Sequence, residues 1–592
     1  MSATAATPTR AYPRQRWVIA PAHPEEAEAL AHDAHLPLVV AELLIARGIS
    51  DARQAHAFLN PDISHLHDPL SMLGMPAAVD RLERAIAARE PVLLYGDYDV
   101  DGTTAVVLLK TAIEMLGGLV RFHVPHRIKE GYGLQSSVLE TAYADGVRLV
   151  ITVDTGMRAF AEAETARRLG LDLIITDHHL PSATDALPDA LAILNPNQPG
   201  CPYPEKSLCG AAIALKLAQA LLERRDPVRA RQKSLPSFLK IAAIATIADA
   251  VPLRGENRTI AAIGLQELRR PVGAGLRALF SVAALDPAAK PLTGFDVAFR
   301  LAPRINAAGR MDVASQIVEL FCTREAPRAR EIAGQLELLN RQRREAEASA
   351  LTAIECRLAD DPELAASRLL VVDGQGWHRG VIGILASRVV ERTAKPAIVV
   401  SVEDNIAHGS GRSVDGFPLL EAIETCGDLF TRFGGHAFAV GFAMPAQALP
   451  ELKRRLNLHA AERLGAREPE HLLRIHAELP LDRITPVLAG WLKMLEPLGH
   501  ANPEPIFLAR AARLTSAPRT MKRHIRLDLR QDTLGSTGVT LRCVGWDWAT
   551  RCSAMQLAAG SVVDVAYRIR ENDHPQYGGL EIEIAGIRLA EG

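Results

Sequence analysis

Acidic and histidine side chains follow three short apolar segments of the sequence, and their types and spacing suit the binding of metal ions. The apolar segments are 91–95, 147–153 and 171–176. The polar residues at their ends are, in chain order, Asp97, Asp99, Asp101, Asp154, Asp177, His178 and His179. Carboxylates held close together repel one another, and divalent cations remove that cost. Oxygen ligands with one imidazole favour Mn2+ or Mg2+ over Zn2+, which prefers sulfur and several imidazoles.

Each of these residues also has an ordinary structural explanation when it is considered alone. A single aspartate after a strand is usually a turn or helix-capping residue, and Asp101-Gly102 can form a turn. Two adjacent histidines are more often structural than catalytic. Such residues rarely gather at three successive strand ends by chance, so the combination favours a metal site. Asp249 is the expected final ligand, because it ends an apolar helix where an unpaired carboxylate would be costly to bury.

Alternating strands and helices are expected to position these side chains. Segments 91–95, 147–153 and 171–176 have the composition of buried strands, and the stretches 103–116 and 159–170 have that of helices. This alternation predicts right-handed βαβ units and a parallel sheet, so the fold class is α/β. Ligands bind at the carboxyl ends of the strands in such sheets, which is where the polar residues lie.

The 592 residues are too many for one hydrophobic core, and changes of pattern along the chain predict several domains. A long, highly charged stretch after residue 325 predicts a helix that connects two α/β domains. Short alternating apolar runs after about residue 505 predict a small β-barrel. The expected parts are a disordered tail and lead-in (1–35), N-terminal helices with the first α/β domain (36–325), the connecting helix (326–362), a second α/β domain (363–465), linker helices (466–504) and the barrel (505–592).

Composition limits the classes of protein to which the chain can belong. Hydrophobic residues make up 48% and charged residues 23%, as in a well-folded soluble protein. We find no apolar run long enough for a bilayer and no signal-peptide layout, so we expect a cytoplasmic protein without a membrane partner. The seven cysteines form no CxxC pair, which argues against a thiolate zinc site or a disulfide framework. The net charge of −2 argues against a generally basic DNA-binding protein but leaves room for a local basic channel.

The motifs also resemble those of a known family. GDYDVDG, VDTG, TDHH and Asp249 are similar, in order and spacing, to the first four motifs of the DHH phosphoesterase superfamily. Nearly the whole chain resembles the RecJ family within it. The resemblance implies a hydrolase of phosphodiester bonds that uses two Mn2+ or Mg2+ ions, with Asp154 bridging them. The metal ligands that it implies are Asp99, Asp101, Asp154, His178 and Asp249.

The resemblance also bears on the residues beside these ligands. Many family members have a histidine where this sequence has Tyr95, so either Asp97 takes over part of its role or one ion is held more weakly. His179 is expected beside the scissile phosphate, as a hydrogen-bond donor to a phosphate oxygen or a proton donor to the leaving group. Asp177 is expected to orient the loop through hydrogen bonds.

Basic and glycine-rich stretches that resemble RecJ supply the candidate DNA contacts. Segment 121–134 is basic with an interleaved aromatic residue, and segment 304–311 places arginines around a small-residue turn. GWHRGVIG, GSGRS and FGGHAFAVGF resemble the DHHA1 domain, whose glycines let backbone N–H groups approach an anion. The alternatives are a solvated loop, an ion pair with a neighbouring helix, and tightly packed turns. The expected contacts are Arg127, Lys129, Tyr132, Arg304, Asn306, Arg310, His378, Ser410, Arg412 and His436, with Ser410 and Arg412 holding a terminal 5′ phosphate.

The expected barrel resembles an OB-fold, with a basic patch at 519–524 that suits single-stranded nucleic acid. Together the resemblances imply a monomeric exonuclease that degrades single-stranded DNA from the 5′ end to mononucleotides, in DNA repair and recombination. A single-strand-binding protein and a helicase are the partners that the family implies. Two other hypotheses are a phosphoesterase for short oligonucleotides or cyclic dinucleotides, and an inactive DNA-binding scaffold, whose sequence signature would be the loss of ligand carboxylates.

Overall fold

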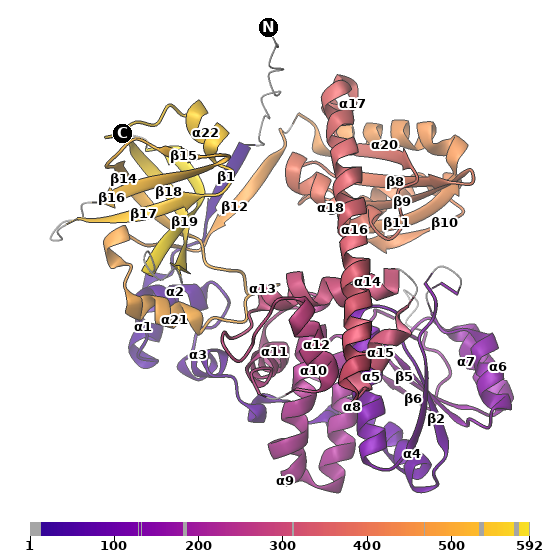
Figure 1. The fold of residues 1–592 in the computed structure, drawn as a ribbon. Coiled ribbons are helices and arrows are strands. Elements are labelled where there is room, and N and C mark those ends of the chain that lie inside the picture. The colour runs from indigo at the N-terminus through magenta and orange to yellow at the C-terminus, as the bar shows by residue number, and fades with distance from the viewer. Residues whose placement is uncertain are drawn as a thin grey trace. The chain divides into compact units, whose positions relative to one another are not determined.

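The computed structural model describes residues 14–127, 130–131, 133–181, 186–270, 272–310, 313–466, 468–531, 538–572 and 579–590. Their helices and strands are labelled in Figure 1. The chain divides into two compact units. The parallel-sheet unit consists of His23–Asn340 and Val487–Glu504, and the barrel unit consists of Met1–Ala22, Arg341–Pro486 and Pro505–Gly592. No helix within the described ranges is long and apolar enough to cross a membrane.

A five-stranded, all-parallel sheet forms the centre of the parallel-sheet unit, with the strand order β3-β2-β4-β5-β6. The strands are β2 (Pro91–Tyr95), β3 (Leu119–His123), β4 (Leu149–Val153), β5 (Asp172–Thr176) and β6 (Ala192–Leu194). The three predicted strands are confirmed as β2, β4 and β5, which are almost entirely buried, as strands covered on both faces should be. β3 and β6 lie outside the predictions, because β3 is a half-exposed edge strand and β6 has three residues.

Helices cover both faces of this sheet. Side chains of β2, β4 and β5 that point to one face join a large core with α4 (Met75–Ala87), α5 (Val100–Met115), α8 (Gly210–Arg225) and α10 (Leu235–Ala248). The side chains on the other face pack against α6 (Ser136–Ala144) and α7 (Phe160–Leu169). This two-sided cover is the arrangement that βαβ units produce, so the predicted fold class is confirmed for this unit.

Further helices and single turns complete the parallel-sheet unit. They are α1 (Pro24–Asp33), α2 (Leu38–Ile45), α3 (Ala52–Leu59), η1 (Ile63–His65), η2 (Pro69–Ser71), α9 (Pro227–Arg229), η3 (Ala230–Ser234), α11 (Gly255–Glu267), α12 (Ala274–Val282), α13 (Gly294–Asp296), η4 (Val297–Leu301), α14 (Ala302–Arg310) and α15 (Ser315–Cys322). The long helix expected over 326–362 is α16 (Ala326–Asp360), and the division between the two units falls inside it.

A segment from far along the chain is part of the parallel-sheet unit. Nε of Arg47 donates to Oδ1 of Asn502 at 2.8 Å. The guanidinium of Arg258 donates to the carbonyl oxygens of Leu495 and Glu496 at 3.0 and 2.8 Å. The structure therefore differs from the expected linker helices over 466–504. The described residues of this range form strands, the single turn η7 (Leu481–Arg483) and the helix α21 (Pro486–Lys493), and the part after α21 is bound to distant arginines.

A mixed sheet forms the second α/β domain, in the barrel unit, with the strand order β10-β11-β9-β8-β7. Its strands are β7 (Leu370–Gln375), β8 (Ala397–Glu403), β9 (Ile406–Arg412), β10 (Arg432–His436) and β11 (Ala439–Pro445). α18 (Ile382–Thr393) packs on one face of the sheet. α19 (Leu419–Glu424) and α20 (Leu449–Leu464) pack on the other face. Figure 1 labels α18 and α20 beside the strands of this sheet. The short helix α17 (Pro362–Ala366) precedes β7.

The C-terminal strands close into a barrel, as predicted. β14, β18, β19, β17 and β16 are paired in that order, and a further pairing of β14 with β16 closes the ring. The elements are β13 (Ala477–Glu478), β14 (Phe507–Leu514), β15 (Arg519–Met521), β16 (His524–Gln531), β17 (Val539–Gly545), α22 (Ala549–Ala554), β18 (Val562–Asn572) and β19 (Gly579–Leu589).

Residues 1–13 of the expected tail and lead-in (1–35) lie outside the described residues, and from Arg14 on the segment contains regular elements. Residues Arg14–Ile19 form β1, which pairs in parallel with β12 (Glu470–Ile475). Residues Pro24–Asp33 form α1. The pairing joins segments more than 450 residues apart, so no local pattern in the sequence could reveal it.

Candidate metal site

Residues of the candidate metal site follow the carboxyl ends of β2, β4 and β5, as predicted, and Asp249 follows α10. Asp97 follows β2, Asp154 follows β4, and Asp177 follows β5. Asp154 has a left-handed backbone with a φ of 61°. This conformation is uncommon for residues other than glycine, and such strained positions often occur at functional sites.

The turn between β2 and α5 brings three aspartates together. Asp99 caps α5 by accepting a hydrogen bond from the Gly102 N–H at 3.0 Å. A Cβ atom on Gly102 would lie 2.6 Å from the backbone nitrogen of Asp97, so the turn can be this tight only with glycine at that position. Asp101 lies in the first turn of α5 and is buried.

The N-terminus of α8 holds one of these carboxylates. The N–H groups of Gly210 and Ala211 donate to the two carboxylate oxygens of Asp101, at 2.6 and 2.8 Å. A Cβ atom on Gly210 would lie 2.6 Å from Cβ of Asp154, so the helix can start here only without a side chain. No feature of the sequence indicates this contact, because a main-chain donor can come from any residue.

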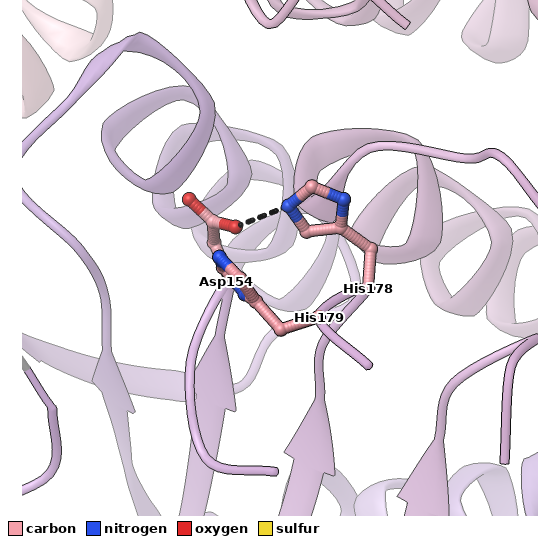
Figure 2. A group of neighbouring side chains, drawn as sticks. All are labelled: Asp154, His178 and His179. Carbon is pink, nitrogen blue, oxygen red and sulfur yellow. Dashed lines mark ion pairs between the residues drawn. The ribbon is translucent and has the colours of Figure 1, made fainter. Parts of the chain in front are cut away.

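One ring nitrogen of His178 lies near the carboxylates of Asp101 and Asp154, and the other lies near that of Asp249. Its Nε2 lies 3.1 Å from Oδ1 of Asp154 and 3.8 Å from Oδ2 of Asp101. Its Nδ1 lies 3.9 Å from Oδ2 of Asp249. Figure 2 shows the imidazole directed at the Asp154 carboxylate. Three groups of residues could each hold a metal ion, because the ligand atoms within each group all lie within 4.8 Å of one another. The groups are Asp97–Asp99–Asp154, Asp101–His178–Asp249 and Asp154–His178–His179. Because the sets share Asp154 and His178, they form one continuous site.

Burial and mutual repulsion raise the pKa values of several carboxylates in this site. Burial and the neighbouring Asp99 raise the pKa of Asp97 to about 8. Burial and Asp101 raise the pKa of Asp249 to about 8. Burial is also the main cause that raises the pKa of Asp154, followed by the charges of the surrounding aspartates. Oδ1 of Asp97 is buried without a hydrogen-bond partner in the described part of the chain. Divalent cations would supply both the missing charge and the missing ligation, so the donor set fits two hard metal ions.

Asp177, which was expected to orient the loop through hydrogen bonds, is hydrogen-bonded to the second histidine of the motif. It is buried and accepts hydrogen bonds from the Met157 N–H at 2.8 Å and from the N–H and Nδ1 of His179 at 3.1 and 2.7 Å. Although burial acts in the opposite direction, these bonds lower the pKa of Asp177. The same carboxylate raises the pKa of His179 against the effect of burial. Asp177 therefore stays charged and favours a protonated His179.

Two asparagines after β6 also hold the histidine loop. Nδ2 of Asn195 donates to the carbonyl of His179 at 2.8 Å, and Nδ2 of Asn197 donates to the carbonyl of His178 at 3.3 Å. Neither asparagine was among the predicted site residues, because β6 was not among the predicted strands. The signal that could have found them is a pair of asparagines directly after a short apolar run.

Tyr95 does not take part in the metal site. Its ring is fully buried and lies 5.2 Å from the ring of His123, and its hydroxyl donates to the carbonyl of Gly133 at 2.8 Å. The carboxylate of Asp97 lies instead with the ligand atoms of Asp99 and Asp154.

The candidate DNA contacts of the parallel-sheet unit have different surroundings. The guanidinium of Arg127 lies over the ring of Tyr98, with 5.0 Å between the guanidinium carbon and the ring centroid. Arg304 makes an ion pair with Glu337 of α16 at 2.6 Å, which is the structural alternative weighed for it. Oδ1 of Asn306 accepts from the N–H of Val100, at the start of α5. Lys129, Tyr132 and the side chain of Arg310 lie outside the described residues.

The candidates of the barrel unit gather at the sheet face covered by α18. Ser410 and Arg412 alternate along β9, and their Oγ and Nη2 atoms would lie 3.1 and 3.4 Å from a Cβ atom on Gly383, in the first turn of α18. His436 is exposed on β10, in the row of the sheet that contains Arg412. Nδ1 of His378 accepts from the N–H of Gly380, within the loop that leads to α18.

Comparison with family models agrees with the architecture. The model of the DHH family, N-terminal domain, matches residues 91–246, the DHHA1 domain matches 362–462, and the RecJ OB domain matches 475–585. The fold and the acidic site together define a phosphoesterase of the DHH class.

Sequence similarity to named proteins shows to which family within the DHH class the chain belongs. The single-stranded-DNA-specific exonuclease RecJ of Bacillus subtilis (strain 168) is 37% identical over 90% of this chain and 66% of its own length. The protein of the same name from Dickeya dadantii (strain 3937) is 35% identical over 83% of this chain and 86% of its own length. The chain belongs to the RecJ family.

Solved structures of the family contain the expected metals. RecJ from Thermus thermophilus in complex with Mn2+ is 28% identical, has a TM-score of 0.81, and matches 98% of this chain and 80% of its own. The complex with Mg2+ has a TM-score of 0.76 and 27% identity, and it matches 98% of this chain and 79% of its own. The prediction of Mn2+ or Mg2+ as the cofactor is thereby confirmed at the level of the family.

Proposed function

We propose that this chain is an exonuclease that degrades single-stranded DNA from the 5′ end to mononucleotides, in DNA repair and recombination. The observation that carries the proposal is the continuous set of carboxylates and imidazoles around Asp154 and His178. The match to the RecJ OB domain favours a DNA strand over a small nucleotide as the substrate, because OB-folds bind single strands.

The acidic residues at the strand ends would hold the metal ions. The ligands that we propose are Asp97, Asp99, Asp101, Asp154, His178 and Asp249, with Asp154 shared between the ions. When bound, two such ions activate a water molecule and neutralise the charge that develops on the phosphate. Asp101 is fixed for this role by the N-terminus of α8.

His179 is the proposed proton donor. The carboxylate of Asp177 binds its Nδ1, so Nε2 is the ring nitrogen that would face the substrate. The raised pKa keeps the imidazolium populated at higher pH. It would donate to a phosphate oxygen, or give its proton to the 3′ oxygen that leaves when the bond to phosphorus breaks.

The face of the barrel unit under α18 is the proposed site for the terminal 5′ phosphate. Ser410 offers a hydroxyl and Arg412 a guanidinium, beside the N-terminus of a 12-residue helix whose first N–H groups favour an anion. His378 and His436 are further candidates on the same domain. An end-binding pocket of this kind explains why the enzyme would start from a chain terminus.

The OB-fold is the proposed contact for the rest of the strand. All three residues of β15 (Arg519–Met521) are exposed, and Arg519 begins the basic patch. Trp546 is 56% exposed, and the centroid of its ring lies 4.9 Å from that of His524. A basic surface beside an exposed aromatic ring suits stacking of bases and attraction of the backbone. For Arg127, Lys129, Tyr132, Asn306 and Arg310 we propose DNA contacts from the family resemblance alone.

The setting of the enzyme is part of the proposal. We propose a monomer that acts in the cytoplasm, together with a single-strand-binding protein and a helicase. The described cysteines form no disulfide, as is usual in a reducing compartment.

Digestion of end-labelled DNA tests the function. With Mn2+, a 5′-labelled single strand should release its label as a mononucleotide at once, a 3′-labelled strand should shorten gradually, and a duplex should resist. Asp154→Ala should lower the rate by about a thousandfold or more, because a shared ligand is lost, while the melting temperature shows that the protein still folds. Digestion from the 3′ end, or faster turnover of dinucleotides than of long strands, would overturn the proposal.

A further inference from the structure

Two phenylalanine side chains are exposed next to each other on the surface of the parallel-sheet unit. Phe295 is 63% exposed and Phe299 is 61% exposed. The centroids of their rings lie 4.6 Å apart, with an interplanar angle of 32°. Single exposed apolar side chains are common on protein surfaces, whereas adjacent ones often mark a surface that binds a ligand or a partner.

Hydrogen bonds fix the helical turns that carry the two rings. Thr293 and Asp296 form a capping box at the start of α13. The guanidinium of Arg300 donates to the carboxylate of Asp296 at 3.1 Å and to the carbonyl oxygen of Ala283 at 2.8 Å. The rings are therefore presented by an ordered element, as a binding surface requires.

The same helical run leads to the metal site. α13, η4 and α14 follow one another along the chain without a break. Near the end of this run, Oδ1 of Asn306 accepts a hydrogen bond from the N–H of Val100, the residue after the candidate ligand Asp99. A Cβ atom on Gly309 would lie 2.3 Å from the carbonyl oxygen of Tyr98. The last turns of the run therefore pack against the loop that carries the aspartates.

The position of the rings along this run determines their distance from the metal site. Asn306 is seven residues from Phe299 and eleven from Phe295, which corresponds to about 10 and 16 Å along a helix. Pro303, between them, is half-buried like Asn306, so the accessible side of the run continues from the rings toward the metal site. An unstacked strand separates successive phosphates by roughly 7 Å, which is about twice the spacing of a stacked strand. The rings therefore lie at the distance of the second and third nucleotides beyond a phosphate bound at the metal site.

A widened helical turn carries Phe299. In η4 the N–H of Ala302 donates to the carbonyl of Val297, which is the hydrogen bond of a π-turn. Pro303 follows and has no N–H for the carbonyl of Phe299, which disfavours a regular α-helical turn at this place. Single π-turns within α-helices occur frequently at functional sites.

The size of the exposed pair indicates a small, flat occupant. Apart from the two rings, the residues of α13, η4 and α14 whose burial is described are buried or half-buried. A stable protein interface covers about 800 Å² on each partner, which is far more than two rings offer. A nucleobase has a flat face of a size similar to an aromatic ring, and bases stack on such rings in proteins that bind single strands.

We propose that Phe295 and Phe299 form a stacking platform for bases on the 3′ side of the cleaved bond. The inference rests on the proposed function and deepens it. Because the product is a mononucleotide, only one nucleotide lies on the 5′ side of the cleaved bond, so bases farther away belong to the strand that remains. Counted from the 5′ end, Phe299 would contact the third base and Phe295 the fourth.

Such a platform would also contribute to the selection of single strands. The bases of a duplex are paired and stacked on one another, and they become available to a protein side chain only when the duplex opens. A single strand offers its bases without that cost. The proposed preference for single-stranded DNA would then have a source close to the metal site.

Strands that lack one base test the platform. A set of 5′-phosphorylated, 5′-labelled single strands carries one abasic nucleotide each, at positions two to eight. Release of the label in a single turnover with Mn2+ reports the first cleavage alone. For the wild-type enzyme, the concentration that gives half-maximal release should rise by about tenfold when the abasic nucleotide is at position three or four, as expected for the loss of one base–aromatic contact. Positions six to eight should have little effect.

Substitution of the rings should remove this dependence. Phe299→Ala and Phe295→Ala should each raise the half-maximal concentration for the unmodified strand by about tenfold, with little change in the rate at saturation. They should also lose the sensitivity to positions three and four, respectively. Phe299→Leu keeps an apolar side chain without a flat ring and should resemble Phe299→Ala, whereas Phe299→Trp should keep the wild-type profile. Because both rings are exposed, the variants should keep the wild-type melting temperature.

A control variant and a binding measurement separate this inference from the proposed function. Tyr143→Ala removes an exposed aromatic side chain that precedes β4 and therefore lies at the opposite edge of the sheet, and it should keep the wild-type profile. Fluorescence anisotropy of the same strands in EDTA gives the profile without cleavage, so it tests the platform even if digestion overturns the proposed function. Identical profiles for the wild type and the alanine variants, or a wild-type profile for Phe299→Leu, would overturn the platform.

Discussion

Among single residues, Asp177 is notable for its contact with the neighbouring His179. It is buried next to the metal-site candidates, yet its oxygens bind His179 and the backbone rather than joining the ligand sets found in the described residues. The two adjacent histidines of the motif have different surroundings. His178 lies beside Asp101, Asp154 and Asp249, whereas His179, which also lies near Asp154, is hydrogen-bonded to Asp177. The sequence predicted this difference from the motif resemblance, and the structure supplies the hydrogen bonds.

Replacement of Asp177 by asparagine tests this role. The carboxylate raises the pKa of His179, so its loss should lower that pKa. If protonated His179 donates during catalysis, the alkaline limb of the profile of kcat against pH should move to lower pH in Asp177→Asn. The acid limb should change less.

The matched control is Asn195→Ala, which removes a hydrogen bond to the carbonyl of the same histidine without changing its charge. This variant should lower kcat without moving the alkaline limb. Equal movement in both variants would show that loop order, and not the charge of Asp177, determines the profile.

Among the elements, α8 determines where two of the carboxylates lie. Its first N–H groups bind Asp101, and its first residue lies against Asp154. The strand ends could be predicted, because buried parallel strands have continuous apolar runs. The contribution of α8 could not, because a helix shows its apolar positions in sequence but not which anion its N-terminus meets.

Gly210→Ala tests the role of α8. A Cβ atom would overlap Asp154, so either the helix or the aspartate must move by several tenths of an ångström. We expect kcat to fall by about a hundredfold, since misplacement of catalytic groups has effects of this size. Initial rates at saturating Mn2+ and DNA measure this effect.

Gly334→Ala is the control, because Gly334 lies in α16 and a Cβ atom there meets nothing within 4 Å. It should keep wild-type activity and gain slightly in stability, as alanine favours helices. Unchanged activity in Gly210→Ala would mean that Asp154 tolerates the displacement.

For the whole molecule, the acidic site links stability to pH and to metal. Asp97 and Asp249 have pKa values of about 8 in the folded, metal-free protein, compared with 3.8 for an ordinary aspartate. The folded state therefore holds more protons than the unfolded state between these values, and the free energy of unfolding should fall as pH rises from about 4 to about 8. Above pH 8 the free energy of unfolding should have lost the whole contribution of these two groups.

Melting temperatures in EDTA and in Mn2+ measure this effect. The metal-free protein should lose stability across the range up to pH 8, and the stabilisation by Mn2+ should grow over the same range. In Asp97→Asn, the metal-free curve should be flatter, because one of the titrating groups is gone. Parallel curves with and without Mn2+ would contradict the link between the carboxylates and the metal.

Long-range order was the part of the molecule that sequence could not reveal. Apolar periodicity predicted α16 and the C-terminal barrel, because each depends on patterns within a few turns or strands. The pairing of β1 with β12 and the binding of Asn502 by Arg47 join distant segments, and neither leaves a local pattern. For the same reason, the expected boundaries of the lead-in and the linker differ from those observed.

The pairing of β1 with β12 has a consequence for how the protein is made. Arg14 at one end of β1 meets its partner Glu470 only after the ribosome has added the intervening chain, which takes about half a minute to a minute and a half at ordinary rates of translation. Until then the first strand of the nascent polypeptide has no neighbour to bind. β1 therefore stays unpaired for most of the synthesis of the chain, and removal of either β1 or β12 would leave the other strand without its partner.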